Sequence, residues 1–145
     1  QRQMCIRDRS FGEEAYEIIR RYMYVREELK PYIMKQMKLA SEDGTPVMRP
    51  LFYDFCGDKN VYDIGDEYMF GPDLLVAPVV ELGARKRMVY LPEGCRWKDA
   101  GTGMVYDGRT RIEADAPLDT IPLFLKEDAR LSLQMKPSTA ETMYR

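Results

Sequence analysis

The sequence contains no histidine, and that absence excludes several kinds of active site. A Ser-His-Asp or Cys-His constellation needs an imidazole to take and return a proton, so neither can form within this chain. Histidine is also a usual ligand of catalytic zinc, so an ordinary catalytic zinc site is disfavoured. The sequence predicts no metal site and no cofactor.

Cysteine, long apolar runs and a dominant charge are also lacking. Cys5, Cys56 and Cys95 are too few and too scattered for a disulfide framework, which favours a reducing compartment, the cytoplasm. No apolar run approaches the roughly 20 residues of a membrane helix. The 22 basic and 24 acidic residues leave a net charge of −2, too weak a field to recruit nucleic acid or an anionic membrane. Neither partner is predicted, whereas a small neutral substrate is compatible with this charge.

The first third of the chain has the pattern of a long helix. Ser10 and Glu13 fit a capping box, so we expect the helix to start there. Apolar residues then recur in steps of three and four over residues 15–40. Pro31 interrupts this stripe and predicts a kink or two abutting helices. Gly44 suits the left-handed residue that ends a helix.

The rest of the chain reads as strands. We expect a first strand over Val47–Phe55, and residues 65–80 mark the change to a run of short strands punctuated by turns. Asp107-Gly108 suits a type I′ turn and predicts a hairpin over Tyr106–Arg109. Short strands with such turns are typical of a small antiparallel sandwich. The expected short strands are Leu74–Val80, Arg87–Leu91, Cys95–Asp99, Met104–Tyr106, Thr110–Ala114, Ile121–Lys126 and Leu131–Gln134.

Four motifs, in a fixed order, carry a resemblance to a known family. Each alone is an ordinary turn or strand sequence, but their order and spacing are specific. On them, the chain resembles the C-terminal part of a glycoside hydrolase family 31 enzyme over roughly Phe11 to Leu125. The motifs are Gly44-Thr45-Pro46-Val47-Met48-Arg49-Pro50-Leu51-Phe52, Gly65 to Val80 with its Gly71-Pro72-Asp73 turn, Tyr90-Leu91-Pro92-Glu93-Gly94, and Ala116-Pro117-Leu118-Asp119-Thr120-Ile121-Pro122-Leu123-Phe124.

The resemblance implies a fold of α/β plus all-β class. Residues 10–70 would form the last helix and strand of a (β/α)8 TIM barrel, with Arg49 as a structural anchor, and residues 71–133 a small antiparallel β-sandwich. Residues 1–9 lack periodicity and a family counterpart, so we interpret them as a non-native leader. The polar residues 134–145 are expected to form a disordered tail.

The resemblance also implies a function. The chain would be a fragment of a retaining α-glycosidase that hydrolyses terminal α-glucosyl or α-xylosyl residues of α-linked oligosaccharides. The family's catalytic nucleophile and acid/base lie upstream, so no catalytic residue is expected here, substrate-binding residues stay unassigned, and homo-oligomerisation is left open. The alternative is a stand-alone β-sandwich that binds carbohydrate or serves as a structural interaction module.

Five aspartates within twenty residues could suggest a glycosidase site. Retaining enzymes need two carboxyl groups about 5–5.5 Å apart, and nothing in the spacing of these aspartates indicates that geometry. A calcium loop is also not matched, because its turn glycine and distal glutamate are missing. We therefore predict turn and cap roles for Asp54, Asp58, Asp63, Asp66 and Asp73.

Three aromatic residues could form a sugar-stacking surface. Trp97, Tyr90 and Tyr106 are candidates, but buried aromatics supply much of the apolar area of a small core. In a strand, Trp97 shares a face with Cys95 and Asp99, while the basic residues between them face the other side. We therefore predict that Trp97 lies in the sandwich core.

Overall fold

The computed structural model describes residues 12–129, 131 and 133, and the chain divides into two compact units between Thr45 and Pro46. The leader at residues 1–9, Ser10 of the expected capping box and the tail at residues 134–145 lie outside the described residues. In the described part, no helix is both long and apolar enough to cross a membrane.

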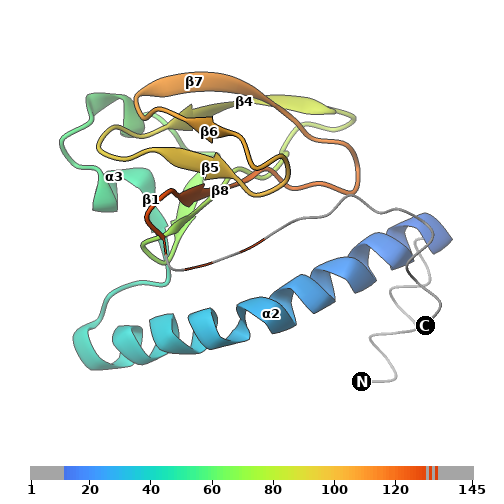
Figure 1. Cartoon of the computed structure of the whole chain (residues 1–145), viewed down its shortest axis with the longest axis horizontal. Helices are drawn as coiled ribbons and strands as arrows, with labels where there is room; N and C mark the ends of the chain where they lie inside the picture. The colour runs from blue at the N-terminus through green and yellow to red at the C-terminus, as the bar shows by residue number, and fades with distance from the viewer. Residues whose placement is uncertain (1–11, 130, 132, 134–145) are drawn as a thin grey trace. The chain divides into compact units, whose positions relative to one another are not determined.

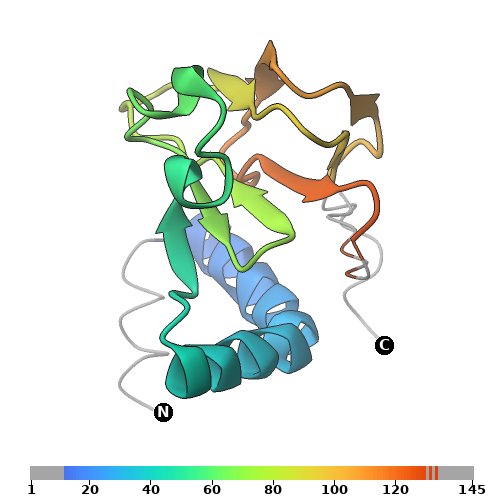
Figure 2. The ribbon, with the colours of Figure 1, turned by 90° about the vertical axis from the view of Figure 1, so that its left-hand side faces the viewer.

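The first unit contains one helix, α2 (Glu13–Asp43). Gly12 occupies its N-cap position without a side-chain hydrogen bond, and two glutamates in the first turn complement the helix dipole. Pro31 lies inside this one continuous helix, so of the two expected outcomes, a kink and two abutting helices, the second is wrong. The ribbon instead changes direction along its length (Figure 2), as expected where proline removes a backbone hydrogen bond. The predicted C-cap is confirmed, because Gly44 is left-handed and donates its N–H to the carbonyl of Ala40 at 3.2 Å.

The second unit consists mainly of two antiparallel sheets, which can be followed in Figure 1. The larger sheet has the order β1-β2-β3-β8-β5-β6, and the smaller pairs β4 with β7. The predicted antiparallel β domain is thus confirmed, whereas no barrel is evident in the described residues. The strands are β1 (Met48–Pro50), β2 (Tyr68–Phe70), β3 (Leu74–Val76), β4 (Lys86–Leu91), β5 (Trp97–Asp99), β6 (Val105–Tyr106), β7 (Thr110–Asp115) and β8 (Leu123–Lys126).

The strand predicted over Val47–Phe55 is wrong in its length and its setting. β1 ends at Pro50, whose φ of −64° and ψ of 156° make it the N-cap of the short helix α3 (Leu51–Asp54). The Phe55 N–H then donates to the Leu51 carbonyl at 3.0 Å. β1 pairs antiparallel with β2 and so belongs to the same sheet as β3. The structural division therefore falls at residues 45/46, whereas the sequence placed it at 70/71.

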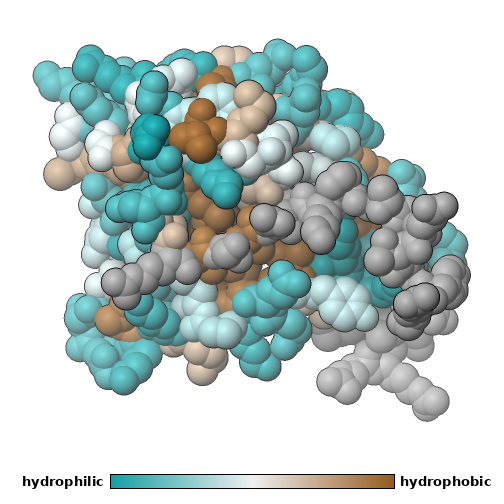
Figure 3. Space-filling view, viewed as in Figure 1, coloured by the Kyte–Doolittle hydropathy of each residue, from teal (hydrophilic) through white to brown (hydrophobic). Residues whose placement is uncertain are grey.

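The two sheets share one hydrophobic core. Leu75 of β3, Val89 of β4 and Trp97 of β5 are each fully buried in it. The predicted burial of Trp97 is confirmed, with Arg96 and Lys98 on the exposed side. Its indole Nε1 donates to the Pro92 carbonyl at 3.0 Å, so the one polar atom of the side chain is satisfied. Hydrophilic residues cover most of the described surface on the face shown in Figure 3, and hydrophobic residues gather near its middle.

The hairpin predicted at Asp107-Gly108 is wrong. β6 pairs with β5, while β7 pairs with β4 in the other sheet, so residues 107–109 cross between sheets. Arg109, with φ of 60°, takes the left-handed position and donates its N–H to the Leu91 carbonyl at 2.7 Å. Gly108 is needed for space: a Cβ there would lie 2.5 Å from the Pro92 carbonyl oxygen and 2.6 Å from that of Cys95.

The remaining strand predictions agree in position but not in length. Leu74–Val80 shortens to β3, since Pro78 cannot donate to a ladder. β2 was not predicted as a separate strand. Leu131–Gln134 falls partly outside the described residues, and its described members, 131 and 133, are not in a strand.

Replacing Trp97 with alanine should remove about 3–5 kcal/mol from the free energy of unfolding, because the indole is fully buried. Denaturant unfolding of Trp97→Ala and of Met88→Ala, which truncates an exposed side chain on β4, measures the difference. A Trp97→Ala protein that melts like its parent but loses affinity for a glucan or xyloglucan fragment would show that the tryptophan is a sugar platform.

Gly108→Ala should destabilise the β unit by at least about 2 kcal/mol, since two backbone oxygens must move to admit the methyl group. The matched control is Gly57→Ala, because its Cβ would meet no atom within 4 Å and its φ is not left-handed. Equal unfolding midpoints for the two variants would refute the steric role of Gly108.

Candidate functional site

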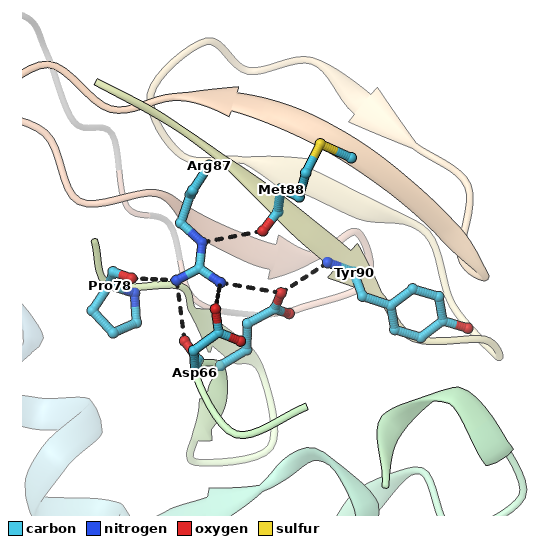
Figure 4. Close-up of polar contacts among 6 residues, drawn as sticks. Asp66, Pro78, Arg87, Met88 and Tyr90 are labelled. Carbon is cyan, nitrogen blue, oxygen red and sulfur yellow. Dashed lines mark hydrogen bonds and ion pairs between the residues drawn. The ribbon is translucent and has the colours of Figure 1, made fainter. Parts of the chain in front are cut away.

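The densest polar cluster in the β unit is centred on Arg87 at the start of β4 (Figure 4). Its Nη2 donates to Asp66 Oδ2 at 2.7 Å and to Glu67 Oε1 at 3.4 Å. Its Nη1 donates to the backbone carbonyls of Asp66, at 3.1 Å, and of Pro78, while Nε donates to the Met88 carbonyl at 3.2 Å. Glu67 Oε1 also accepts the Tyr90 N–H at 2.9 Å. One guanidinium thus joins β4 to the segments next to β2 and β3.

The alternation of inward-facing and outward-facing side chains along the strands explains why Glu67 and Arg87 are buried together. Glu67 shares a face with Met69 of β2, and Arg87 shares a face with Val89 of β4, so both charges lie on the core side. Sequence reasoning assigned no role to either residue. The signal was present, because an acid and a base that each fall on a buried face of a strand need a partner.

Burial raises the pKa of Glu67 from its ordinary 4.5 to about 7, although the Tyr90 N–H and Arg87 act in the opposite direction. A carboxyl that holds a proton near neutral pH has one property of a general acid. Glu67 is only 6% exposed, however, and its Oε1 is bound to Arg87 and Tyr90. The cluster therefore joins strands, and its bonds to Arg87 and Tyr90 occupy one of the two carboxyl oxygens of Glu67.

A second network is built around Asp58, which is 6% exposed. It caps the 3-10 helix η1 (Lys59–Val61) by accepting the Asn60 N–H at 3.0 Å, so the predicted cap role is confirmed. Its Oδ2 also accepts the Tyr90 hydroxyl at 2.6 Å and the Glu93 N–H at 3.1 Å. Burial alone would raise the pKa of Asp58, but these hydrogen bonds outweigh it and hold the pKa below its usual value.

Two of the other aspartates are bound to arginines. Asp54 forms an ion pair with Arg49 at 3.1 Å, and Asp66 belongs to Arg87, so turn or cap roles for these two are corrected to ion pairs. Burial raises the pKa of Asp54, although Arg49 and Lys126 act against it. Asp63 is exposed, and the backbone carbonyl of Asp73 accepts the Lys126 N–H at 3.0 Å.

Arg49 and the three candidate aromatic residues pack against other side chains of the β unit. Arg49 is 6% exposed and also lies over the Tyr53 ring at 5.3 Å, as a structural anchor would. Trp97 and Tyr90 are buried, and Tyr106 is half-buried with its ring edge-on to Phe124, so these aromatics do not form an open sugar platform. Among the described residues, no group of three or more His, Cys, Asp or Glu side chains could hold a metal ion.

Comparison with known proteins gives a consistent result. Residues 44–130 match the family model described as the glycosyl hydrolase family 31 C-terminal domain. The chain is 36% identical over 131 residues to alpha-glucosidase 2 of Bacillus thermoamyloliquefaciens, covering 90% of this chain and 16% of that protein. It is 40% identical over 123 residues to an alpha-xylosidase of Saccharolobus solfataricus, covering 85% of this chain and 17% of the relative.

A solved structure agrees with these matches. The alpha-xylosidase from a soil metagenome, complexed with xylose, superposes with a TM-score of 0.82 and is 50% identical. The match covers 85% of this chain and 18% of that one. This chain thus spans less than a fifth of the length of these relatives.

The stability of the protein should depend on pH through Glu67. A carboxyl whose pKa is raised on folding favours the folded state while protonated, so its contribution is complete below pH 4.5 and is lost as pH rises to about 7. The free energy of unfolding should fall by up to about 3 kcal/mol across this window. Glu67→Gln should remove most of the fall and leave the part that the raised pKa of Asp54 contributes. Glu81→Gln, at an exposed position, should keep the whole fall. A fall that persists unchanged in Glu67→Gln would assign it to another group.

Proposed function

Because this chain belongs to glycoside hydrolase family 31, we propose that it is the C-terminal part of a retaining α-glycosidase that hydrolyses terminal α-glucosyl or α-xylosyl residues of oligosaccharides. The observation that carries the proposal is the match of residues 44–130 to the C-terminal domain of that family. The names of the alpha-glucosidase and alpha-xylosidase relatives support the substrate class.

In this proposal the chemistry resides outside the chain. One carboxylate of the remaining part would form a covalent glycosyl-enzyme, and a second would act first as acid and then as base. The described aspartates support this division, since Asp54, Asp58 and Asp66 are each engaged in ion pairs or caps. We include no cofactor in the proposal. We place the enzyme in the cytoplasm, which the unpaired Cys56 and Cys95 support.

We assign α2 to the end of the (β/α)8 barrel and the second unit to the β-sandwich beside it. This assignment moves the boundary expected from the sequence, 70/71, to 45/46. It is supported by the antiparallel pairing of β1 with β2 and by the start of the family match at residue 44. The alternative of a stand-alone carbohydrate-binding module loses its main support, because Trp97 and Tyr90 are buried.

The proposal is tested with a chimera in which residues 12–129 replace the matching segment of the soil-metagenome alpha-xylosidase. The chimera should hydrolyse an aryl α-xyloside, whereas the 145-residue chain alone should show no turnover of α-xylosides or α-glucosides above background. The controls are the relative with its own segment and the relative with that segment deleted.

Two results would contradict the proposal. One is a folded but inactive chimera. The other is turnover by the chain alone that disappears in Asp54→Asn. The DNA upstream of this coding sequence gives an independent test, since the proposal requires a barrel-coding frame continuous with Phe11, whereas a start codon with no barrel would favour the stand-alone module.

A further inference from the structure

Three large side chains are exposed together on the β unit, and we call them the aromatic patch: Met48, Phe52 and Tyr62. Their exposed fractions are 58%, 44% and 55%. All three line one shallow surface cavity of about 530 Å³. Clustered exposed hydrophobic side chains on a folded domain mark a surface that contacts something else.

The patch is held in place and is not a set of loose side chains. The rings of Phe52 and Tyr62 are stacked, with centroids 5.8 Å apart and an interplanar angle of 6°. The Tyr62 hydroxyl donates to the Cys56 carbonyl at 3.0 Å. Because the rings are already ordered, a partner that packs on them loses little side-chain entropy.

Two buried polar atoms near the patch have no hydrogen-bond partner in the described part of the chain. They are Nε of Arg49 and Oε2 of Glu67, and both residues line the same cavity. Each residue is 6% exposed. Unpartnered buried polar atoms are costly, and native structures usually satisfy them. A donor and an acceptor from a packed partner could satisfy both after a small shift of the covering side chains.

We propose that the aromatic patch is the surface on which this β unit packs against the catalytic portion that precedes it in the enzyme. This inference rests on the proposed function and adds to it the interface through which the chain would act. The three relatives described above have more than four fifths of their length outside the match, so a large partner in the same polypeptide is expected.

The position of the patch favours that occupant. Met48 is the third residue of the second unit, so the patch lies in sequence directly after the entry of the chain from the preceding part. Interfaces between domains bury about 600–1,500 Å² and use such mixed apolar and polar surfaces. A sugar is the less suitable occupant, because Phe52 and Tyr62 stack on each other and each ring keeps only its other face for stacking on a sugar.

The test is oxidative footprinting of the active chimera by hydroxyl radicals, which convert exposed methionine to the sulfoxide. Met48 and Met104 are matched probes, being 58% and 56% exposed in this chain. Each oxidation rate is divided by the rate of the same residue in the chimera unfolded in guanidinium. Packing of the patch against the catalytic portion should slow the oxidation of Met48 several-fold relative to Met104, because susceptibility to oxidation follows exposure.

A pair of variants provides the functional readout. Phe52→Asp should lower the melting temperature and the α-xylosidase activity of the chimera, because a charge would enter the interface. Val105→Asp should change neither, although Phe52 and Val105 are both 44% exposed in this chain.

Other footprints would overturn the inference. Equal oxidation of Met48 and Met104 in an active chimera would show that the patch is open, with the proposed function intact. Protection of Met48 that grows with protein concentration would assign the patch to a second copy, and protection seen only with added oligosaccharide would assign it to sugar. A folded, inactive chimera would contradict the proposed function, and the inference with it.

Discussion

The buried pair of Arg87 and Glu67 constrains how the two sheets of the β unit meet. The smaller sheet has only two strands, so its position depends on contacts with the larger one. Removing an acid and a base from water costs several kcal/mol, and only a matched geometry recovers it. Arg87 reaches Glu67, Asp66 and the carbonyl of Pro78 from one position on β4, and a shift of β4 along its axis would break all of these contacts. The pair thus contributes more to fixing the position of β4 against the larger sheet than to the free energy of unfolding.

The same strand fixes the loops that precede β2. Tyr90 uses its backbone N–H for Glu67 and its hydroxyl for Asp58, so one residue of β4 holds two points of residues 58–67. Asp58 in turn accepts the N–H of Glu93 in the turn that follows β4. Because these bonds are buried or partly buried, they keep more of their strength than exposed ones. The segment that carries Tyr62 is therefore bonded to β4 at both of its ends.

Local signals in the sequence predicted those features that depend on a few neighbouring residues. The left-handed Gly44, the buried face of Trp97 and the positions of most short strands follow from turn chemistry and from the two-residue period of strands. The wrong predictions concern residues whose conformation depends on contacts with segments distant in the sequence. Asp107-Gly108 has the sequence of a hairpin, but Gly108 is required by the carbonyls of residues 92 and 95. The strand expected over Val47–Phe55 ends at Pro50 because α3 begins there. The pairing of Glu67 with Arg87 could be predicted only by comparing the inward-facing positions of two strands, because neither residue lies in a distinctive motif.

Three acidic side chains of the β unit are bound to arginines, and one of them also lies at the outer surface cavity. They are Asp54, Asp66 and Glu67. Glu67 binds Arg87 between the sheets and also lines the shallow surface cavity that the aromatic patch lines, so the contact between the sheets and the outer surface share one residue.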